Sequence, residues 1–476
     1  MLKDLLKEGG LYTIANLLTK GVSLMLIPFY TSYFTTSDYG VIDILALFGS
    51  FVINVLILQL NRGLSRHVAE PKLEKSEKIV YASTAIWSTI GLLVFGYLIL
   101  VFNQDSIISY LSADKEIEKT TYLLAITSVV LNAFFYLLGV YLRSLRRSKE
   151  FATISFLHAV LGILGVLLLV IKFDYGINSV YLSFIIIVPI LIVYEIYLLR
   201  GYIKMTFDFS ILKKLLHYSV PLVPASIAVI VMNFSDRIYI KEYLNFSELG
   251  VYAVGTKFST IIGIVIAGFS MAITPLIIEN QYKEETKKEL TKIFDIFISF
   301  GTIGVLLLTL FSKEIINVFT TKNFHNASDV MPLMFLTAYF VGFSMFSYGL
   351  ILKKKTIISS LLVIVFAGLN ITLNIYLIPK YGIMGAALAT LISTLSYQFC
   401  LFYIARKYFK FPFKWIKISM ISGFHILIIG TIMYWNPEIN VVNFGVKLIL
   451  LFFYIFLLFF IKVLNINSIL NFIKRK

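Results

Sequence analysis

Charged residues are scarce in this sequence. They make up 14% of the 476 residues, against about 25% in ordinary soluble domains, whereas apolar residues make up 59%. A water-soluble protein of this composition could not cover its surface with polar side chains, but a lipid bilayer removes that need. The chain also has a single cysteine, Cys400, inside an apolar run, which excludes disulfides and thiolate metal sites. We therefore predict an all-α integral membrane protein.

Sequence patterns that carry catalytic chemistry are missing as well. There is no D-x-D, no H-E-x-x-H and no cysteine–histidine cluster. The segment 250–257 comes near a P-loop, but its Thr and Lys stand in the wrong order. The longest loop outside the membrane, residues 103–119, has no room for a folded catalytic domain. We expect no enzymatic activity and no cofactor, with coupling to a proton or sodium gradient left open.

Apolar runs recur along the whole chain, and many reach the roughly 20 residues that a helix needs to cross a bilayer. We predict about fourteen spans. The shortest break between two of them is at Lys380, Tyr381 and Gly382. The predicted spans lie near 11–30, 41–60, 79–102, 120–142, 151–171, 178–199, 218–240, 251–278, 293–311, 328–352, 357–378, 382–404, 415–435 and 446–464.

Positive charge collects on one side of these spans. With the N-terminus in the cytoplasm, the inside segments and the inner ends of the last two spans hold 31 Lys and Arg residues, and the outside loops hold 7. This bias places both termini in the cytoplasm, because short cytoplasmic loops are enriched in Lys and Arg. It also accounts for the net charge of +16 without a nucleic-acid partner.

Weak internal echoes indicate a duplication. The segment 37–41 (SDYGV) recurs 210 residues later at 247–251 (SELGV), and two further echoes have offsets of 207 and 206. The alternative is that bilayer constraints produce similar loops by chance. An offset of six spans would make the halves parallel repeats around a central cavity. The predicted division is an N-lobe at 1–199 (spans 1–6), a cytoplasmic interfacial linker at 200–217, a C-lobe at 218–404 (spans 7–12), and spans 13–14 with a cytoplasmic tail at 405–476.

Four short motifs resemble those of polysaccharide flippases of the Wzx type. They are GGLYTIAN at 9–16, IPFY at 27–30, SDYG at 37–40, and YSVPLVP at 218–224 followed by Asp236-Arg237. The resemblance implies two six-helix lobes around a V-shaped cavity, with two extra C-terminal helices in this chain.

The same resemblance also implies a function. It implies that an undecaprenyl-diphosphate-linked oligosaccharide is flipped by alternating access from the inner to the outer leaflet of a bacterial cytoplasmic membrane, for O-antigen or capsule biosynthesis. Membrane lipids and the polysaccharide polymerase and chain-length proteins are the partners it implies. The superfamily also contains multidrug exporters and the lipid II flippase. Fourteen spans is the count of the lipid II flippase, whereas many Wzx proteins and multidrug exporters have twelve, so the subfamily stays open.

Charged residues inside the spans are the candidate site, because each one at the bilayer centre costs about 2.5–3.5 kcal/mol on insertion scales. Lys20 is at the middle of the first span, roughly 14 Å from either end. It either lines the cavity or forms a salt bridge to a neighbouring span, where Asp43 is the nearest candidate in sequence. As cavity cations that would bind the substrate diphosphate through charge-assisted hydrogen bonds, we predict Lys20, Arg62, Lys257 and Arg237.

Each of these residues has a structural alternative. Lys257 is close enough to the outer interface to extend its amine outward, and Arg62 could be an ordinary inside anchor. Asp43 and Asp236 are predicted as cavity acids or gating residues, and Asp236 and Arg237 could simply pair with each other. A multidrug exporter would need cavity acids to bind cations, whereas a membrane polymerase would need a catalytic outside loop.

Overall fold

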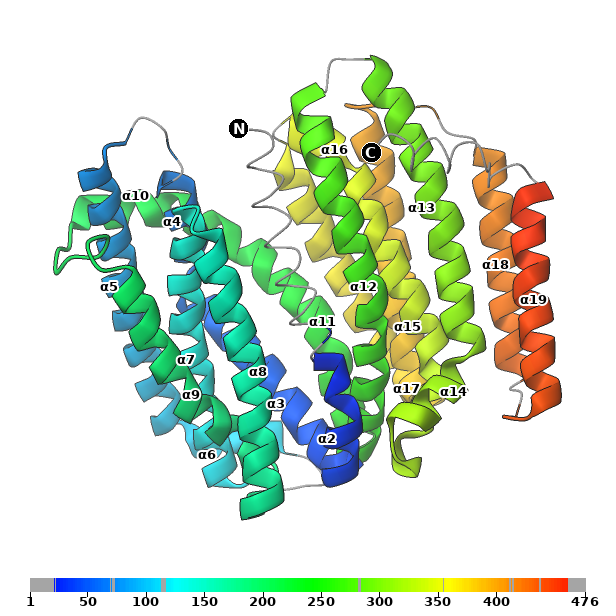
Figure 1. Ribbon diagram of the computed structural model, residues 1–476, viewed down its shortest axis with the longest axis horizontal. Coiled ribbons are helices and arrows are strands. Elements are labelled where there is room, and N and C mark those ends of the chain that lie inside the picture. Colours follow the sequence, from blue (N-terminus) through cyan, green and yellow to red (C-terminus); the bar gives the residue numbers. More distant parts are fainter. Residues whose placement is uncertain are drawn as a thin grey trace. The chain divides into compact units, whose positions relative to one another are not determined.

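The computed structural model describes residues 21, 23–68, 70, 73–112, 117–280, 284–353, 355–410, 412, 415–435 and 438–460. These residues are helices joined by short connections, and the only β-bridge among them joins Arg200 and Ile203. The predicted all-α class is confirmed. The chain forms two compact units, residues 1–250 and 251–476 (Figure 1).

The first unit is built around α7, which packs against α3, α5, α8 and α9. In Figure 1, α4 and α10 lie at one end of this unit and α6 lies at the other. Its helices are α2 (Ile27–Tyr33), α3 (Thr36–Leu56), α4 (Leu60–Val68), α5 (Lys75–Phe102), α6 (Gln104–Leu111), α7 (Lys119–Ser144), α8 (Ser148–Phe173), α9 (Asn178–Leu198), α10 (Phe209–Ser219), η1 (Val220–Leu222), α11 (Val223–Tyr243) and the first turn of α12 (Phe246–Asn280).

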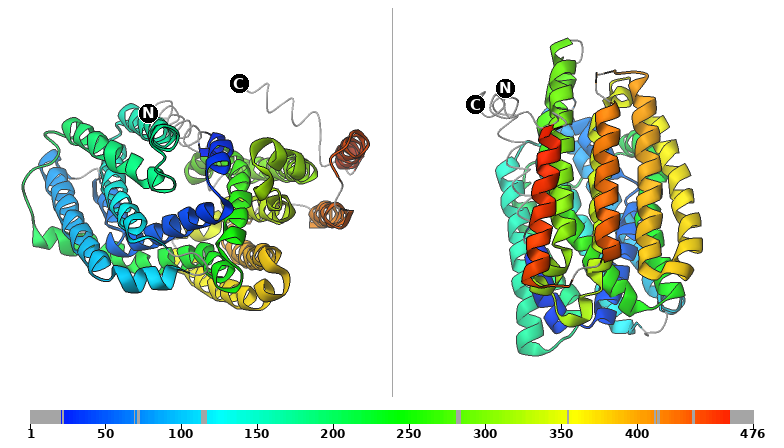
Figure 2. Two further views of the ribbon diagram at one scale, coloured as in Figure 1. Left: turned by 90° about the horizontal axis from the view of Figure 1, so that it is seen from below. Right: turned by 90° about the vertical axis from the view of Figure 1, so that its right-hand side faces the viewer.

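The second unit is built around α13, α15 and α17, with α18 and α19 at one edge, outside α13 and α15 (Figures 1 and 2). Its helices are the rest of α12, then α13 (Glu284–Leu310), α14 (Ser312–Phe319), η2 (Lys322–Phe324), α15 (Ala327–Val341), η3 (Gly342–Phe346), α16 (Tyr348–Leu352), α17 (Thr356–Arg406), α18 (Trp415–Trp435) and α19 (Val441–Phe460).

The predicted spans correspond closely to these helices. Among the described residues, eleven helices are long and apolar enough to cross a membrane, and α18 coincides with the predicted span at 415–435. The predicted span at 11–30 lies almost wholly outside the described residues. The count of fourteen therefore stays a prediction.

The long helix α17 is two spans joined by a sharp turn. Gly382 has a φ of 59°, outside the helical region, at the break that the sequence predicted. Asn370 Nδ2 lies 3.4 Å from Thr390 Oγ1, although twenty residues of straight helix would separate them by about 30 Å. The two halves therefore fold back on each other, which is why 357–378 and 382–404 act as separate spans.

The predicted linker forms a helix at its C-terminal end. Asp208 caps α10 by accepting hydrogen bonds from Ser210 and from the backbone N–H of Ile211, and these bonds lower the pKa of its carboxyl. Leu215 is fully buried in the core cluster that α4, α5 and α7 share, and Leu212 packs beside it. The apolar face of α10 is thus largely covered by protein.

The division into units differs from the predicted lobe boundary at 217/218. Helix α11, which the sequence assigns to the C-lobe, packs against α3 and belongs by its contacts to the first unit. The lobe assignment itself stays a prediction.

The two SDYGV-like segments contact each other inside the first unit. The hydroxyls of Thr36 and Ser247 are 2.7 Å apart. A Cβ added to Gly40 would overlap the backbone oxygen of Phe246, and one added to Gly250 would overlap that of Thr36. Since 246 follows 36 and 250 follows 40 by the same 210 residues, the contact is reciprocal. Two copies of a segment that are related by a two-fold axis give this pattern. The close approach of the two backbones requires glycine at both positions, because small residues let helices approach closely.

Candidate functional site

A buried ion cluster joins α3 to α11 in the first unit. Arg237 Nε lies 3.4 Å from Asp43 Oδ2, and Arg237 Nη1 lies 2.7 Å from Asp236 Oδ2. The same Nη1 also donates to the backbone oxygen of Asn233, one turn earlier on α11. The cluster therefore fixes the arginine from its own helix and from a helix almost two hundred residues away in sequence.

The cluster is nearly closed to solvent. The side chains of Arg237, Asp43 and Asp236 are 13%, 10% and 1% exposed. Asp43 lies seven residues into α3 and Arg237 six residues before the end of α11, so both are about 10 Å inside the helix ends. Charges at such depth are tolerated when they pair and are fully hydrogen-bonded.

Two buried tyrosines lie close to Asp43. Tyr39 is one turn earlier on α3, and Tyr181 is on α9. The hydroxyl of Tyr181 is buried and has no hydrogen-bond partner among the described residues. An unsatisfied buried hydroxyl is costly unless something else fills its bonding capacity. The polar character of this region thus extends beyond the three ions.

A second polar feature lies where α3 ends. Leu58 and Gln59 have φ values of 50° and 55°, a left-handed conformation that non-glycine residues seldom adopt. Gln59 is buried and donates to Asn54 Oδ1 at 2.8 Å, while its own oxygen has no partner among the described residues. Strained backbone of this kind concentrates at functional sites, and broken membrane helices line substrate paths. Arg62 follows immediately on α4 and is exposed.

The predicted site residues are only partly brought together. Arg237, Asp43 and Asp236 form one cluster, whereas Arg62 is beyond the far end of α3, about 20 Å along the helix from Asp43. Lys257 is half-buried on the part of α12 that belongs to the second unit. Lys20 lies outside the described residues. Asp43, which the sequence offered as a partner of Lys20, is paired with Arg237. These two residues are far apart in sequence, so their pairing was not predicted.

The chain matches the polysaccharide biosynthesis protein family over residues 5–281, more than half its length and all of the buried ion cluster. The chain belongs to that family. Residues 221–377 also match the MatE family. An uncharacterized membrane protein of Methanocaldococcus jannaschii is 21% identical over 291 residues, which cover 57% of this chain and 55% of that protein. The chain thus spans about half the length of this curated relative.

Solved structures show the fold of this polysaccharide biosynthesis protein. The lipid II flippase MurJ in an inward closed conformation superposes with a TM-score of 0.75 at 18% identity, covering 94% of this chain and 97% of MurJ. An inward-facing MATE multidrug transporter of the MOP superfamily gives a TM-score of 0.69 at 14% identity, covering 85% and 96%. Both are transporters, and the predicted resemblance to the flippase superfamily is confirmed.

Sequence inspection of this family member missed several buried polar groups. Lys241, 3% exposed, donates to the carbonyl of Tyr110 at 2.7 Å and so caps the end of α6. Lys447, 1% exposed, pairs with Glu314 at 2.6 Å. Asn370 and Asn374 are fully buried, and Asn374 Nδ2 donates to Asn370 Oδ1 at 3.1 Å. In the described part of the chain, no group of three or more His, Cys, Asp or Glu residues could hold a metal ion.

Proposed function

We propose that this protein flips an undecaprenyl-diphosphate-linked oligosaccharide from the inner to the outer leaflet of a bacterial cytoplasmic membrane, by alternating access, for surface polysaccharide assembly. The observation that carries the proposal is the family match, which covers the whole region of α3, α11 and their ion cluster. The likeness to the lipid II flippase over 94% of the chain supports a lipid-linked substrate.

The state of the buried acids separates this proposal from its main rival. A cation exporter, which the MatE match at 221–377 favours, needs carboxylates free to bind a positive substrate. Here Asp43 and Asp236 are paired with Arg237, and Glu314 is paired with Lys447. Glu195 is a buried acid without an ion-pair partner among the described residues, but it is packed against Gly139 of α7. These acids are therefore poor receptors for a cationic drug.

The basic residues have the complementary role in this proposal. Lys20, Lys257 and Arg62 bind the diphosphate, because ammonium and guanidinium groups give strong charge-assisted hydrogen bonds to phosphate oxygens. Arg237 is neutralised by Asp43 and Asp236 and holds α3 against α11. Lipid-linked substrate, membrane lipids and the polymerase and chain-length proteins are its proposed partners. A proton or sodium gradient is the proposed energy source.

Deletion of the gene tests the function. The lipid-linked oligosaccharide should accumulate in the cytoplasmic leaflet, measured by its protection from an external glycosidase, while resistance to cationic drugs stays unchanged. Complementation with the intact chain is the control. Changed drug efflux with normal surface glycan would assign the protein to the exporters.

Substitution of the proposed diphosphate ligands tests the mechanism. In proteoliposomes containing lipid-linked oligosaccharide, Lys20→Ala and Lys257→Ala should each lose most flipping, and Lys20→Arg should keep much of it. Lys20→Glu should be inactive, because a carboxylate repels the diphosphate. Lys322→Ala, which changes an exposed lysine of η2, is the matched control. Full activity of Lys20→Ala would refute the ligand role of that residue.

A further inference from the structure

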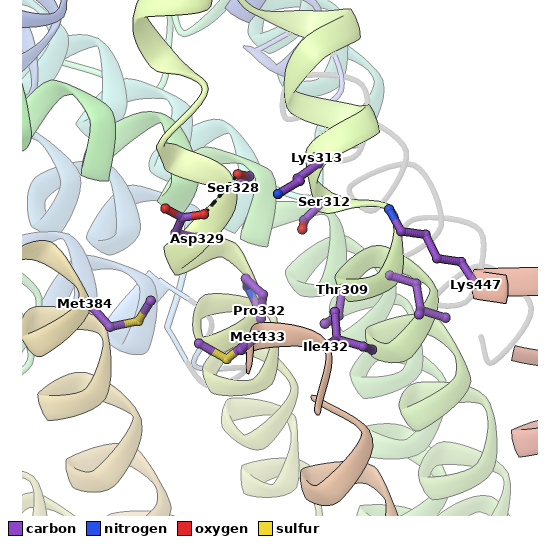
Figure 3. A pocket seen from close by; sticks show the side chains of 11 residues that line it. Thr309, Ser312, Lys313, Ser328, Asp329, Pro332, Met384, Ile432, Met433 and Lys447 are labelled. Carbon is purple, nitrogen blue, oxygen red and sulfur yellow. Dashed lines mark hydrogen bonds between the residues drawn. The ribbon is translucent and has the colours of Figure 1, made fainter. Parts of the chain in front are cut away.

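A cavity of about 230 Å³ lies in the second unit, at the end where α13 meets α14 and α15 begins (Figure 3). The wall combines polar side chains of α13, α14 and α15 with apolar side chains of α15, α17 and α18. By the predicted topology this end faces the outside of the membrane. The cavity is separate from the ion cluster, which belongs to the first unit.

The polar wall offers both donors and acceptors. Lys313 extends from α14 toward Ser328 and Asp329 at the start of α15, and the two latter side chains are 3.4 Å apart (Figure 3). Ser312 and Thr309 complete this wall. Thr309 is fully buried, and its hydroxyl has no hydrogen-bond partner among the described residues. A buried hydroxyl at a cavity wall is more stable when a ligand supplies the missing bond.

The charges at the cavity nearly cancel. Lys313 and Asp329 oppose each other on the wall, and Lys447 is already paired with Glu314. A phosphate or a lipid headgroup phosphate would meet the carboxylate of Asp329 as well as the ammonium of Lys313, and the charge of Lys447 is already matched by Glu314, which removes the electrostatic gain of binding an anion. A neutral molecule with many hydroxyls can instead donate to Asp329 and accept from Lys313, Ser312 and Thr309 at once.

The remaining wall is apolar. Pro332, Met384, Ile432 and Met433 face the polar side chains across the cavity (Figure 3). The C–H face of a sugar ring is apolar while its rim carries hydroxyls, so a sugar matches both walls. The volume is below the roughly 300–1,000 Å³ of sites for drug-sized ligands, so it suits one ring and excludes a whole repeat unit or a folded peptide.

We propose that this cavity is a sugar subsite that holds one ring of the oligosaccharide at the outer end of the second unit. The identity of the sugar as part of an exported glycan rests on the proposed function. Binding itself is a property of the cavity and is measured without transport.

Cysteine protection in intact cells tests the subsite directly. Cys400 is the only cysteine of the chain, so Cys400→Ser gives a background without thiols. In that background Ser328→Cys places a thiol on the cavity wall, and Asn323→Cys places one in the exposed segment nearby. A membrane-impermeant maleimide should label both from outside, Ser328→Cys more slowly because Ser328 is 6% exposed. The probes are glucose, galactose, N-acetylglucosamine and glucuronate, with betaine at equal osmolality and inorganic phosphate as controls.

The expected result is selective protection. At about 100 mM, at least one sugar should slow labelling of Ser328→Cys about tenfold if its Kd is about 10 mM, and should leave Asn323→Cys unchanged. Thr309→Val in the same background should abolish the protection. Thr302→Val, the same change on the same helix but away from the cavity, should keep it.

Three results would overturn the subsite: no sugar protects, phosphate protects and sugars do not, or Asn323→Cys is labelled from outside while Ser328→Cys is not. These outcomes are independent of the flippase test. Sugar protection without lipid accumulation in the deletion strain would refute the proposed function and leave the subsite standing. Lipid accumulation in the deletion strain without sugar protection would refute the subsite and support the proposed function.

Discussion

Each unit buries a basic side chain near one end, and the two are neutralised differently. Arg237 in the first unit bridges two carboxylates, one on its own helix and one on α3. Lys447 in the second unit makes a single pair with Glu314, which connects α19 to α14. Glu314 is 19% exposed, whereas Asp236 is 1% exposed. The first cluster thus links two helices through two carboxylates, and the second links two helices through a single ion pair.

The difference bears on how charge inside a membrane is interpreted. A basic residue in an apolar span suggests an anionic ligand, yet these two residues have carboxylates from their own chain as partners. The evidence for an anionic substrate therefore rests on Lys20, Lys257 and Arg62, and not on Arg237. Because the Arg237 cluster and the Lys447 pair are neutralised differently, we expect mutations in them to lower stability by different amounts.

The largest effect is expected for Arg237→Ala. The change leaves Asp43 and Asp236 buried without their cation, and breaking a buried pair in this way costs about 3–5 kcal/mol. Abundance in the membrane and the denaturant midpoint in detergent should both fall. The triple variant Arg237→Met, Asp43→Asn, Asp236→Asn should recover most of the loss, and exposed Arg62→Ala is the control. A midpoint equal to that of the unchanged protein would mean that the cluster does not hold α3 to α11.

A smaller loss is expected for Lys447→Met. Lys447→Met leaves one carboxylate without its cation, whereas Arg237→Ala leaves two, so the cost should be below the range given for Arg237. The unfolding midpoints of Lys447→Met, Glu314→Gln and the double variant form a cycle that isolates the pair. A coupling as large as that of Arg237 with Asp43 would remove the distinction between the two clusters.

Gly40→Ala tests the close contact between α3 and the start of α12. The new methyl group would overlap the backbone oxygen of Phe246, and overpacking typically costs about 1–3 kcal/mol. Gly91→Ala is the matched control, because a Cβ there meets nothing within 4 Å. Equal unfolding midpoints for the two variants would show that the α3–α12 contact adjusts freely.

The smallest effect is expected for loss of the α10 cap. Asp208→Ala removes the acceptor of the Ser210 and Ile211 N–H groups, so the unfolding midpoint should fall slightly. Asp208→Asn keeps an acceptor and should stay near the original midpoint. Asp208 takes part in neither ion cluster, so an effect as large as that of Lys447→Met would show that the loss of stability does not follow the burial of the charge that is removed.

Much of the fold could be predicted from the sequence because bilayer thickness fixes the length of apolar runs. The helix at 415–435 and the break at Gly382 were placed correctly for that reason. The turn at Leu58 and Gln59 was not foreseen, since neither glycine nor proline marks it and the predicted span continued to 60.

The site was less predictable than the fold. Asp43 and Arg237 were both identified, but their pairing joins residues 194 apart, and no local pattern encodes which helices meet. The same holds for Lys447, which the apolar run of span 14 gave no reason to pair with Glu314 on a short helix between spans 9 and 10.

The reciprocal contact of Gly40 and Gly250 resembles the interface of a symmetric homodimer. In a homodimer with two-fold symmetry, a residue of one subunit meets a residue of the other, and the same two positions meet again with the subunits exchanged. Thr36 against Gly250 and Gly40 against Phe246 repeat that relation inside one chain, with 210 residues in place of a subunit boundary. The predicted duplication accounts for this relation, because fusion of two copies of a half-length chain that dimerised through this contact would preserve it.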